Sequence, residues 1–249
     1  MAASVGGTGG PVHDRRGTGS PVVLLHGLAS THRWWDLVTR HLPRRRLLRW
    51  DHRGLHDCVV AGHSMGAAVA LQLAARRPDL VASVCCVEGG LPDPRTLFGE
   101  DWNTAHALMR YDRRTEPTAA ILAAWVRGAE LPDTALPAVL ANHQPAPEPG
   151  RLRLRLDQGA ETGLAYSVWC QRPAGLLARI KVPVTAVLAR PKSPAQLHRL
   201  EAALRSTVDQ SGRQVHTVWL DGGHDLPLQH PARIASLIKD LADRTWSGP

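Results

Sequence analysis

The chain has 249 residues, a length that suits one α/β domain able to bury most of its apolar surface. Its formal net charge is +8, and the arginines that supply most of this charge are scattered, without the interleaved aromatic residues of a nucleic-acid surface. We therefore expect no nucleic-acid partner. The four cysteines (58, 85, 86 and 170) and the acidic and histidine residues lack metal-ligand spacing. This predicts reduced core cysteines, no metal ion and no other cofactor.

The first 20 residues, MAASVGGTGGPVHDRRGTGS, are rich in glycine and polar residues. They lack the apolar run of an export signal, and no later run approaches membrane-spanning length. We expect a cytoplasmic protein without a membrane partner. Residues 1–20 are expected to form a flexible lead-in, in which at most Pro11 to Arg16 forms a fragment of strand.

Val22 to Leu25 is a continuous apolar run that ends in His26-Gly27, as expected of a strand buried on both faces. A loop after such a strand can direct a main-chain N–H toward an oxyanion. Ser30 to Leu42 then has apolar residues at roughly helical spacing. This segment predicts a helix capped by Ser30 or Thr31.

The central stretch is Cys58 to Leu71, CVVAGHSMGAAVAL, where an apolar strand passes through G-H-S-M-G into an alanine-rich helix. Strand, turn and helix form the context in which G-x-S-x-G predicts a nucleophile elbow. A turn that holds a serine in strained torsions leaves no room for side chains two residues away, which explains Gly62 and Gly66. Ser64 is therefore the candidate nucleophile.

After the Ser64 helix, strands and helices continue to alternate along the chain, apart from one inserted segment that is rich in proline. Residues 91–176 are proline-rich and interrupted, with helix-like pieces at Trp102 to Arg110, Thr118 to Arg127 and Gly159 to Trp169. Further strands are expected at Leu80 to Val87, Ile180 to Leu188 and Val215 to Leu220, and further helices at Pro194 to Arg205 and Pro231 to Ala242.

A strand ending in His-Gly, a G-x-S-x-G turn and a late glycine-flanked histidine in VHTVWLDGGHDLPLQHP (215–231) follow one another in order. This arrangement resembles the α/β-hydrolase superfamily, and more closely its small serine hydrolases of the esterase, lactonase and C–C-bond hydrolase kind. The resemblance implies an α/β-hydrolase fold: a mostly parallel sheet with helices on both faces. It also implies a core of residues 21–90 and 177–249, with a helical cap inserted at 91–176.

Two parts of the family pattern look missing. Most of the two leading strands is absent, and only six residues, His52 to Asp57, separate the D-x-R-G turn from the serine strand. Six residues span about 20–25 Å when fully extended, barely enough to return along a strand of roughly 17–20 Å, so the usual helix cannot fit. We expect Arg46 to Asp51 to be displaced, shortened or irregular.

A serine hydroxyl needs a base within hydrogen-bond reach. The resemblance implies that this base is His224, which follows the last strand after two glycines. It also implies an oxyanion hole made by the main-chain N–H groups of Met65 and Leu28.

Most relatives place a carboxylate after the strand that corresponds to Val182 to Leu188, where it fixes the imidazole tautomer. Here that strand is followed by ARPKSP (189–194), which contains no acid. Some relatives carry the acid one strand earlier, where this chain has Glu88. We expect Glu88 as the third member and keep Asp93 in reserve, with a serine–histidine dyad as the alternative.

The expected reaction is hydrolysis of an ester or thioester of a small or medium apolar acyl group, through an acyl-enzyme and without a cofactor. Candidates for the substrate-facing surface of the cap are Phe98, Trp102, Leu108, Met109, Tyr111, Trp125, Tyr166 and Trp169, although cap packing is the commoner use of such residues. C–C bond hydrolysis, lactone opening and perhydrolysis remain alternatives, because the pocket decides among them. A catalytically impaired hydrolase-like binding protein is a further alternative, motivated by the missing helix and the vacant acid position.

Overall fold

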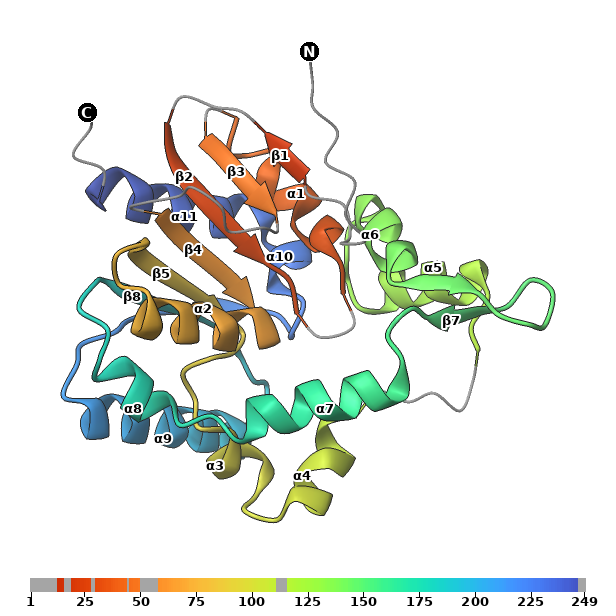
Figure 1. The fold of residues 1–249 in the computed structure, drawn as a ribbon. Helices are drawn as coiled ribbons and strands as arrows, with labels where there is room; N and C mark the ends of the chain where they lie inside the picture. The colour runs from red at the N-terminus through yellow and green to blue at the C-terminus, as the bar shows by residue number, and fades with distance from the viewer. Residues whose placement is uncertain are drawn as a thin grey trace.

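A seven-stranded sheet lies at the centre of the structure, a computed structural model that describes residues 13–15, 19–27, 30–43, 45–49, 58–110 and 116–245. The strands run in the order β1-β3-β2-β4-β5-β8-β9 (Figure 1). Their bounds are β1 His13–Arg15, β2 Gly19–Leu25, β3 Arg45–Arg49, β4 Cys58–His63, β5 Val81–Val87, β8 Val184–Arg190 and β9 His216–Asp221. β1 is antiparallel to β3, and the other neighbouring pairs are parallel. The prediction of a mostly parallel sheet is confirmed.

Helices cover both faces of this sheet, as predicted (Figure 1). One face packs against α2 (Met65–Arg76), α8 (Pro173–Leu177) and α9 (Pro194–Ser211), and the other against α1 (Asp36–Thr39) and α11 (Pro231–Thr245). Alternate residues of β2 enter the two cores: Val23 and Leu25 face α2, whereas Val22 and Leu24 face α11. A continuous apolar run was therefore the correct signal for a strand buried on both sides.

The segment between β5 and β8 is mainly helical and carries a small second sheet. Its elements before α8 are α3 Pro94–Phe98, α4 Trp102–Met109, α5 Ala119–Gly128, the 3-10 turn η2 Asp133–Ala135, α6 Leu136–Ala141, β6 His143–Pro145, β7 Leu152–Leu154 and α7 Gln158–Trp169. The three predicted helical pieces are present as α4, α5 and α7. The antiparallel pair β6–β7 was not predicted, because three-residue strands are too short to show an alternating pattern.

A third apolar core joins this segment to the main sheet layer. It packs α5 and α6 against the 3-10 turn η1 (His32–Trp35) and α10 (Leu226–Gln229). The helix predicted for residues 30–42 is therefore shorter than expected, because it consists of η1 followed by the single turn of α1. Thr31, one of the two predicted caps, is the N-cap residue of η1, but its side chain makes no cap hydrogen bond. Ser30 Oγ instead donates to the Gly27 carbonyl at 2.9 Å.

β3 tests part of the expectation that residues 46–51 are displaced, shortened or irregular. It pairs in parallel with β2, from Pro21 beside Arg46 to Val23 beside Leu48, so the strand is not displaced. The irregularity is confined to a register shift between Gly19 and Pro21. Residues 50–57, which carry the D-x-R-G turn and the short link, lie outside the described residues. β1 lies within the predicted strand fragment 11–16.

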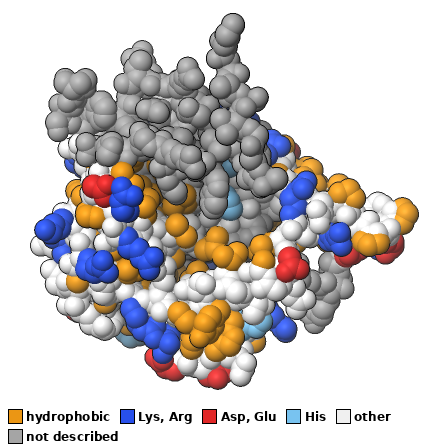
Figure 2. All heavy atoms as spheres, viewed as in Figure 1, with side chains coloured by type: hydrophobic (Ala, Val, Ile, Leu, Met, Phe, Trp, Pro, Cys, Tyr) orange, Lys and Arg blue, Asp and Glu red, His pale blue; other side chains and the backbone are white. Residues whose placement is uncertain are grey.

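Charged groups on the surface follow the scattered pattern of the sequence. On the face shown in Figure 2, lysine and arginine side chains lie apart from one another rather than in one continuous patch. Three cysteines are buried, but Cys170 is exposed, so the prediction that it belongs to the core was wrong. Among the helices that the structure describes, none has the length and apolar character needed to cross a bilayer.

Candidate active site

Ser64 lies on a sharp bend between β4 and α2. Its torsions are φ 55° and ψ −119°, in the region that non-glycine residues rarely adopt, and its N–H donates to the Val87 carbonyl at 2.9 Å. A Cβ atom at Gly62 would lie 2.1 Å from the Gly66 carbonyl oxygen, and one at Gly66 would lie 2.3 Å from that of Leu25. The two glycines therefore allow the close approach of strand, turn and helix that raises Ser64 above the sheet.

His224 is brought to this bend by the loop that follows β9. Its Nε2 atom lies 2.9 Å from Ser64 Oγ, although the two residues are 160 positions apart in the chain. The His224 side chain is half exposed, at 54% of its full area. The ring is thus within hydrogen-bond reach of the hydroxyl and also open to a small molecule.

Glu88 completes a continuous line of contacts. Its Oε2 atom lies 3.3 Å from Nδ1 of His224, while its Oε1 atom accepts the Ala189 N–H. Because an ionised carboxylate only accepts, Nδ1 donates to it, which leaves Nε2 free to accept the Ser64 proton. Glu88 itself has a left-handed φ of 51° at the end of β5, which directs the side chain toward the loop of His224.

The charges around His224 favour its protonated form. Partial loss of hydration lowers its pKa, but the hydrogen bond and the charge of Glu88, together with the charge of Asp225, outweigh that effect. The pKa of His224 is therefore raised above its ordinary value of 6.5. Burial raises the pKa of the Asp225 carboxyl, the charge of His224 opposes this, and the charge of Glu88 adds to it. Because its pKa is raised, the His224 imidazole is a better proton acceptor than a free histidine.

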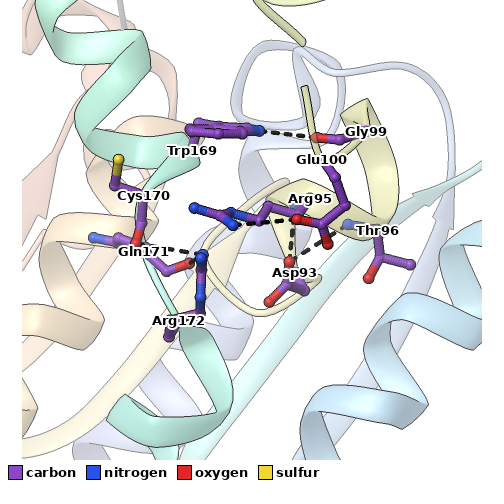
Figure 3. Close-up of polar contacts among 9 residues, drawn as sticks. All are labelled: Asp93, Arg95, Thr96, Gly99, Glu100, Trp169, Cys170, Gln171 and Arg172. Atoms are coloured by element: carbon purple, nitrogen blue, oxygen red, sulfur yellow. Dashed lines mark hydrogen bonds and ion pairs between the residues drawn. The ribbon is translucent and has the colours of Figure 1, made fainter. Parts of the chain in front are cut away.

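Asp93, the reserve acid, has a different use. Its Oδ1 atom accepts from the N–H groups of Arg95 at 2.8 Å and Thr96 at 3.4 Å, which makes it the N-cap of α3. Figure 3 shows this carboxylate turned toward those two residues. The structure brings Glu88, not Asp93, to His224.

The structure describes one of the two residues predicted to form the oxyanion hole. Met65 is the first residue of α2. The main-chain N–H groups in the first turn of a helix have no acceptor within that helix. Met65 lines the cavity beside Ser64. Leu28 lies outside the described residues.

A cavity of about 470 Å³ opens beside Ser64 and His224. Its wall also includes the apolar residues Pro92, Pro94, Leu97, Phe98, Leu108, Met109, Ala165, Val168, Leu188 and Leu200. Of the aromatic and apolar residues proposed to face substrate, Phe98, Leu108 and Met109 line it; Tyr111 lies outside the described residues. Arg110 supplies the one Lys or Arg side chain among the described residues of the wall.

Three of the other proposed residues pack against one another instead. Trp102, Tyr166 and Trp169 contact one another, with ring centroids 5.0 to 5.9 Å apart. The Arg95 guanidinium lies over the Trp169 ring, 4.3 Å from its centroid, and Trp169 Nε1 donates to the Gly99 carbonyl at 3.0 Å (Figure 3). This cluster holds α3, α4 and α7 together behind the cavity wall. Trp125 is exposed on α5.

Three other histidines lie near the motifs, and the structure gives one of them a contact with the site. His63 Nε2 lies 2.7 Å from the main-chain oxygen of His224. His26 Nδ1 instead lies 3.0 Å from the Gly27 oxygen, and His230 Nε2 lies 2.5 Å from that of Asp221. The adjacency of His63 to Ser64 was the available signal, but a main-chain contact 161 positions away leaves no sequence pattern.

The described residues contain no group of three or more His, Cys, Asp or Glu side chains able to hold a metal ion.

Comparison with known proteins gives the family. A model of the alpha/beta hydrolase family matches residues 12–237. The chain belongs to the alpha/beta hydrolase family. A curated relative, lipase LipV of Mycobacterium tuberculosis, is 26% identical in an alignment 248 positions long. The alignment covers 88% of this chain and 91% of the lipase.

Solved structures show the same fold at lower identity. E-2-(acetamidomethylene)succinate hydrolase superposes with a TM-score of 0.68 and 19% identity, covering 93% of this chain and 94% of that one. The thioesterase domain from the curacin biosynthetic pathway gives 0.64 and 19%, covering 92% and 99%. The two solved structures are hydrolases with different substrates, so the shared fold does not identify the substrate of this chain.

Proposed function

We propose that this protein is a serine hydrolase that cleaves an ester or thioester of a small or medium apolar acyl group through an acyl-enzyme. The observation that carries the proposal is the unbroken series of contacts from Ser64 Oγ to His224 and from His224 to Glu88. The similarity to a lipase supports an ester as the bond that is cleaved.

In the proposed reaction, Ser64 Oγ attacks the acyl carbon while its proton passes to Nε2 of His224. Glu88 stabilises the imidazolium that forms. The Met65 N–H, at the start of α2, stabilises the negative charge on the acyl oxygen, with the Leu28 N–H as the second proposed donor. His224 then protonates the leaving alcohol or thiol. In the second half of the reaction, a water molecule attacks the acyl carbon while its proton passes to His224, and His224 returns a proton to Ser64 Oγ as the acid leaves.

The cavity supports an apolar acyl group of limited size. Its volume of about 470 Å³ is within the range of small-molecule sites, and most of its wall is apolar. Much of this wall comes from α3, α4 and α7, which lie between residues 91 and 176. We therefore include in the proposal a cap of residues 91–176 over a core of 21–90 and 177–249.

Hydrolysis of p-nitrophenyl esters of increasing acyl length tests this proposal. Purified protein should release p-nitrophenol, with kcat/KM greatest for short to medium acyl chains, and Ser64→Ala should abolish the release. Ser167→Ala is the matched control, because it removes an exposed hydroxyl from α7 that bonds only within its own helix. Folded wild-type protein that releases no product from any chain length would support the alternative of a binding protein without turnover.

Arg110 favours a second candidate, a hydrolase for substrates whose acyl group carries an acid. It is exposed, and it adds one positive charge to a wall that is mostly apolar. A guanidinium can bind a carboxylate through two parallel hydrogen bonds. The hydrolase with the TM-score of 0.68 is named for a succinate, which bears such groups.

A further inference from the structure

His63 makes a contact that the proposed chemistry does not use. It is the last residue of β4, directly before Ser64, and its Nε2 atom lies 2.7 Å from the main-chain oxygen of His224. A carbonyl oxygen only accepts hydrogen bonds, so Nε2 must carry the proton and donate it. The residue next to the nucleophile thus holds the main chain of the residue that supplies the base.

The surroundings of His63 fix both the position and the tautomer of its ring. The side chain is 3% exposed, and its Nδ1 atom has no hydrogen-bond partner among the described residues. The ring stacks on Trp34 at 6.1 Å on one side and meets the His224 ring at 4.9 Å, centroid to centroid. Burial lowers the pKa of His63 to about 3, and the nearby His224 adds to this effect. The ring therefore stays neutral with its single proton on the atom that faces His224.

The loop that carries His224 needs such a contact because it contains no strand or long helix. Besides the main-chain bonds of the short helix α10 to Asp225 and Leu226, two side chains contact this loop: Gly223 N–H donates to Gln229 Oε1 at 2.8 Å, and His230 Nε2 donates to the Asp221 oxygen at 2.5 Å. Both partners come from the segment just downstream. The His63 bond instead connects His224 itself to the central sheet.

We propose that His63 is a positioning residue, which holds the main chain of His224 against the strand of Ser64 so that the His224 ring stays within reach of the Ser64 hydroxyl. This inference rests on the proposed serine-hydrolase function. A hydrogen bond of this kind contributes a free energy equivalent to about a tenfold change in rate or affinity. A displacement of a catalytic group by 1 Å costs up to about a hundredfold.

Two substitutions of His63 by an amide side chain separate the effect of its hydrogen bond to His224 from the effect of a buried polar group. In His63→Gln the side-chain NH₂ stands about where Nε2 of the histidine stands, whereas in His63→Asn the shorter side chain falls short of the His224 oxygen. Both variants bury one amide and should lose similar stability. We expect His63→Gln to keep kcat within about threefold of wild type, and His63→Asn to lose about ten- to a hundredfold in kcat with little change in KM.

Val60→Ala controls for stability, because Val60 is buried in the same strand and faces the core under α2. It should lower the unfolding temperature and leave kcat unchanged. Equal kcat values for the folded Gln and Asn variants would overturn the positioning role, as would a loss of kcat in Val60→Ala equal to that in His63→Asn.

A second measurement does not depend on turnover. The proton that His224 Nδ1 shares with Glu88 should give a low-field ¹H NMR resonance in wild type and in His63→Gln. In His63→Asn this resonance should broaden or shift. If it is the same in all three proteins, the positioning role fails. If wild type shows the resonance and its dependence on His63 but hydrolyses no ester, the proposed function fails while the positioning of His224 stands.

Discussion

Glu88 and His224 are 136 positions apart in the chain, and their side chains meet with Oε2 of Glu88 3.3 Å from Nδ1 of His224. Glu88 follows β5, His224 follows β9, and the end of β8 lies between them in the sheet. Glu88 crosses this gap while its other oxygen accepts the N–H of Ala189 in β8. A carboxylate from β5 thus reaches the place left without an acid after β8.

Glu88→Gln tests the role of this carboxylate. The substitution keeps the size of the side chain but removes its charge and disturbs the tautomer of His224, so kcat should fall by about 10² to 10⁴. Ester hydrolysis under saturating substrate gives the value. Asp93→Asn is the matched control: asparagine caps a helix about as well as aspartate, so both the unfolding free energy and kcat should stay nearly unchanged. The opposite pattern would assign the acid to Asp93.

The pH dependence follows from the raised pKa of His224. The base acts only when neutral, so kcat/KM should fall as the pH decreases through this pKa, with the acidic midpoint above 6.5. In Glu88→Gln the hydrogen bond and charge that raise the pKa are lost, and the midpoint should move to lower pH. The rate of covalent labelling of Ser64 measures both midpoints. A midpoint that stays in place on substitution would mean that Glu88 does not interact with His224 in solution.

Gly62→Ala tests the sterics of the bend at Ser64. The added methyl group would lie 2.1 Å from the Gly66 oxygen, a clash with main chain that should cost about 1–3 kcal/mol of unfolding free energy or more. Gly163→Ala is the control, because its Cβ in α7 meets no atom within 4 Å. Alanine should stabilise that helix by up to about 1 kcal/mol. Denaturant unfolding of both variants should give changes of opposite sign.

Arg110 distinguishes the two candidate substrate classes. If it binds an acid on the acyl group, Arg110→Gln should raise KM for a p-nitrophenyl hemisuccinate about tenfold or more and leave KM for the neutral butyrate ester unchanged. Equal effects on the two esters would remove the acid-bearing substrate from consideration. Initial rates over a range of substrate concentrations provide the comparison.

The elements that the sequence predicts well are those with long periodic patterns. β2, β4, α2 and α11 follow directly from apolar runs and helical spacing, and Gly62 and Gly66 mark the bend at Ser64. Residues 46–51 were expected to be displaced, shortened or irregular. Displacement was wrong, because β3 still pairs in parallel with β2, although the register shifts at the start of this pairing. The contacts of Glu88 and His63 with the loop of His224 join residues more than 130 positions apart. Such contacts depend on side-chain reach across strand ends, which leaves no local pattern.

Covalent labelling shows whether Ser64 is a nucleophile activated by His224. Purified protein is incubated with a fluorophosphonate, and the modified residue is identified by mass spectrometry of the digested chain. We expect one label per chain on Ser64, no label in Ser64→Ala, and labelling at least a hundredfold slower in His224→Ala. Folded protein that takes up no label, or that is labelled equally fast without the His224 ring, would contradict this expectation.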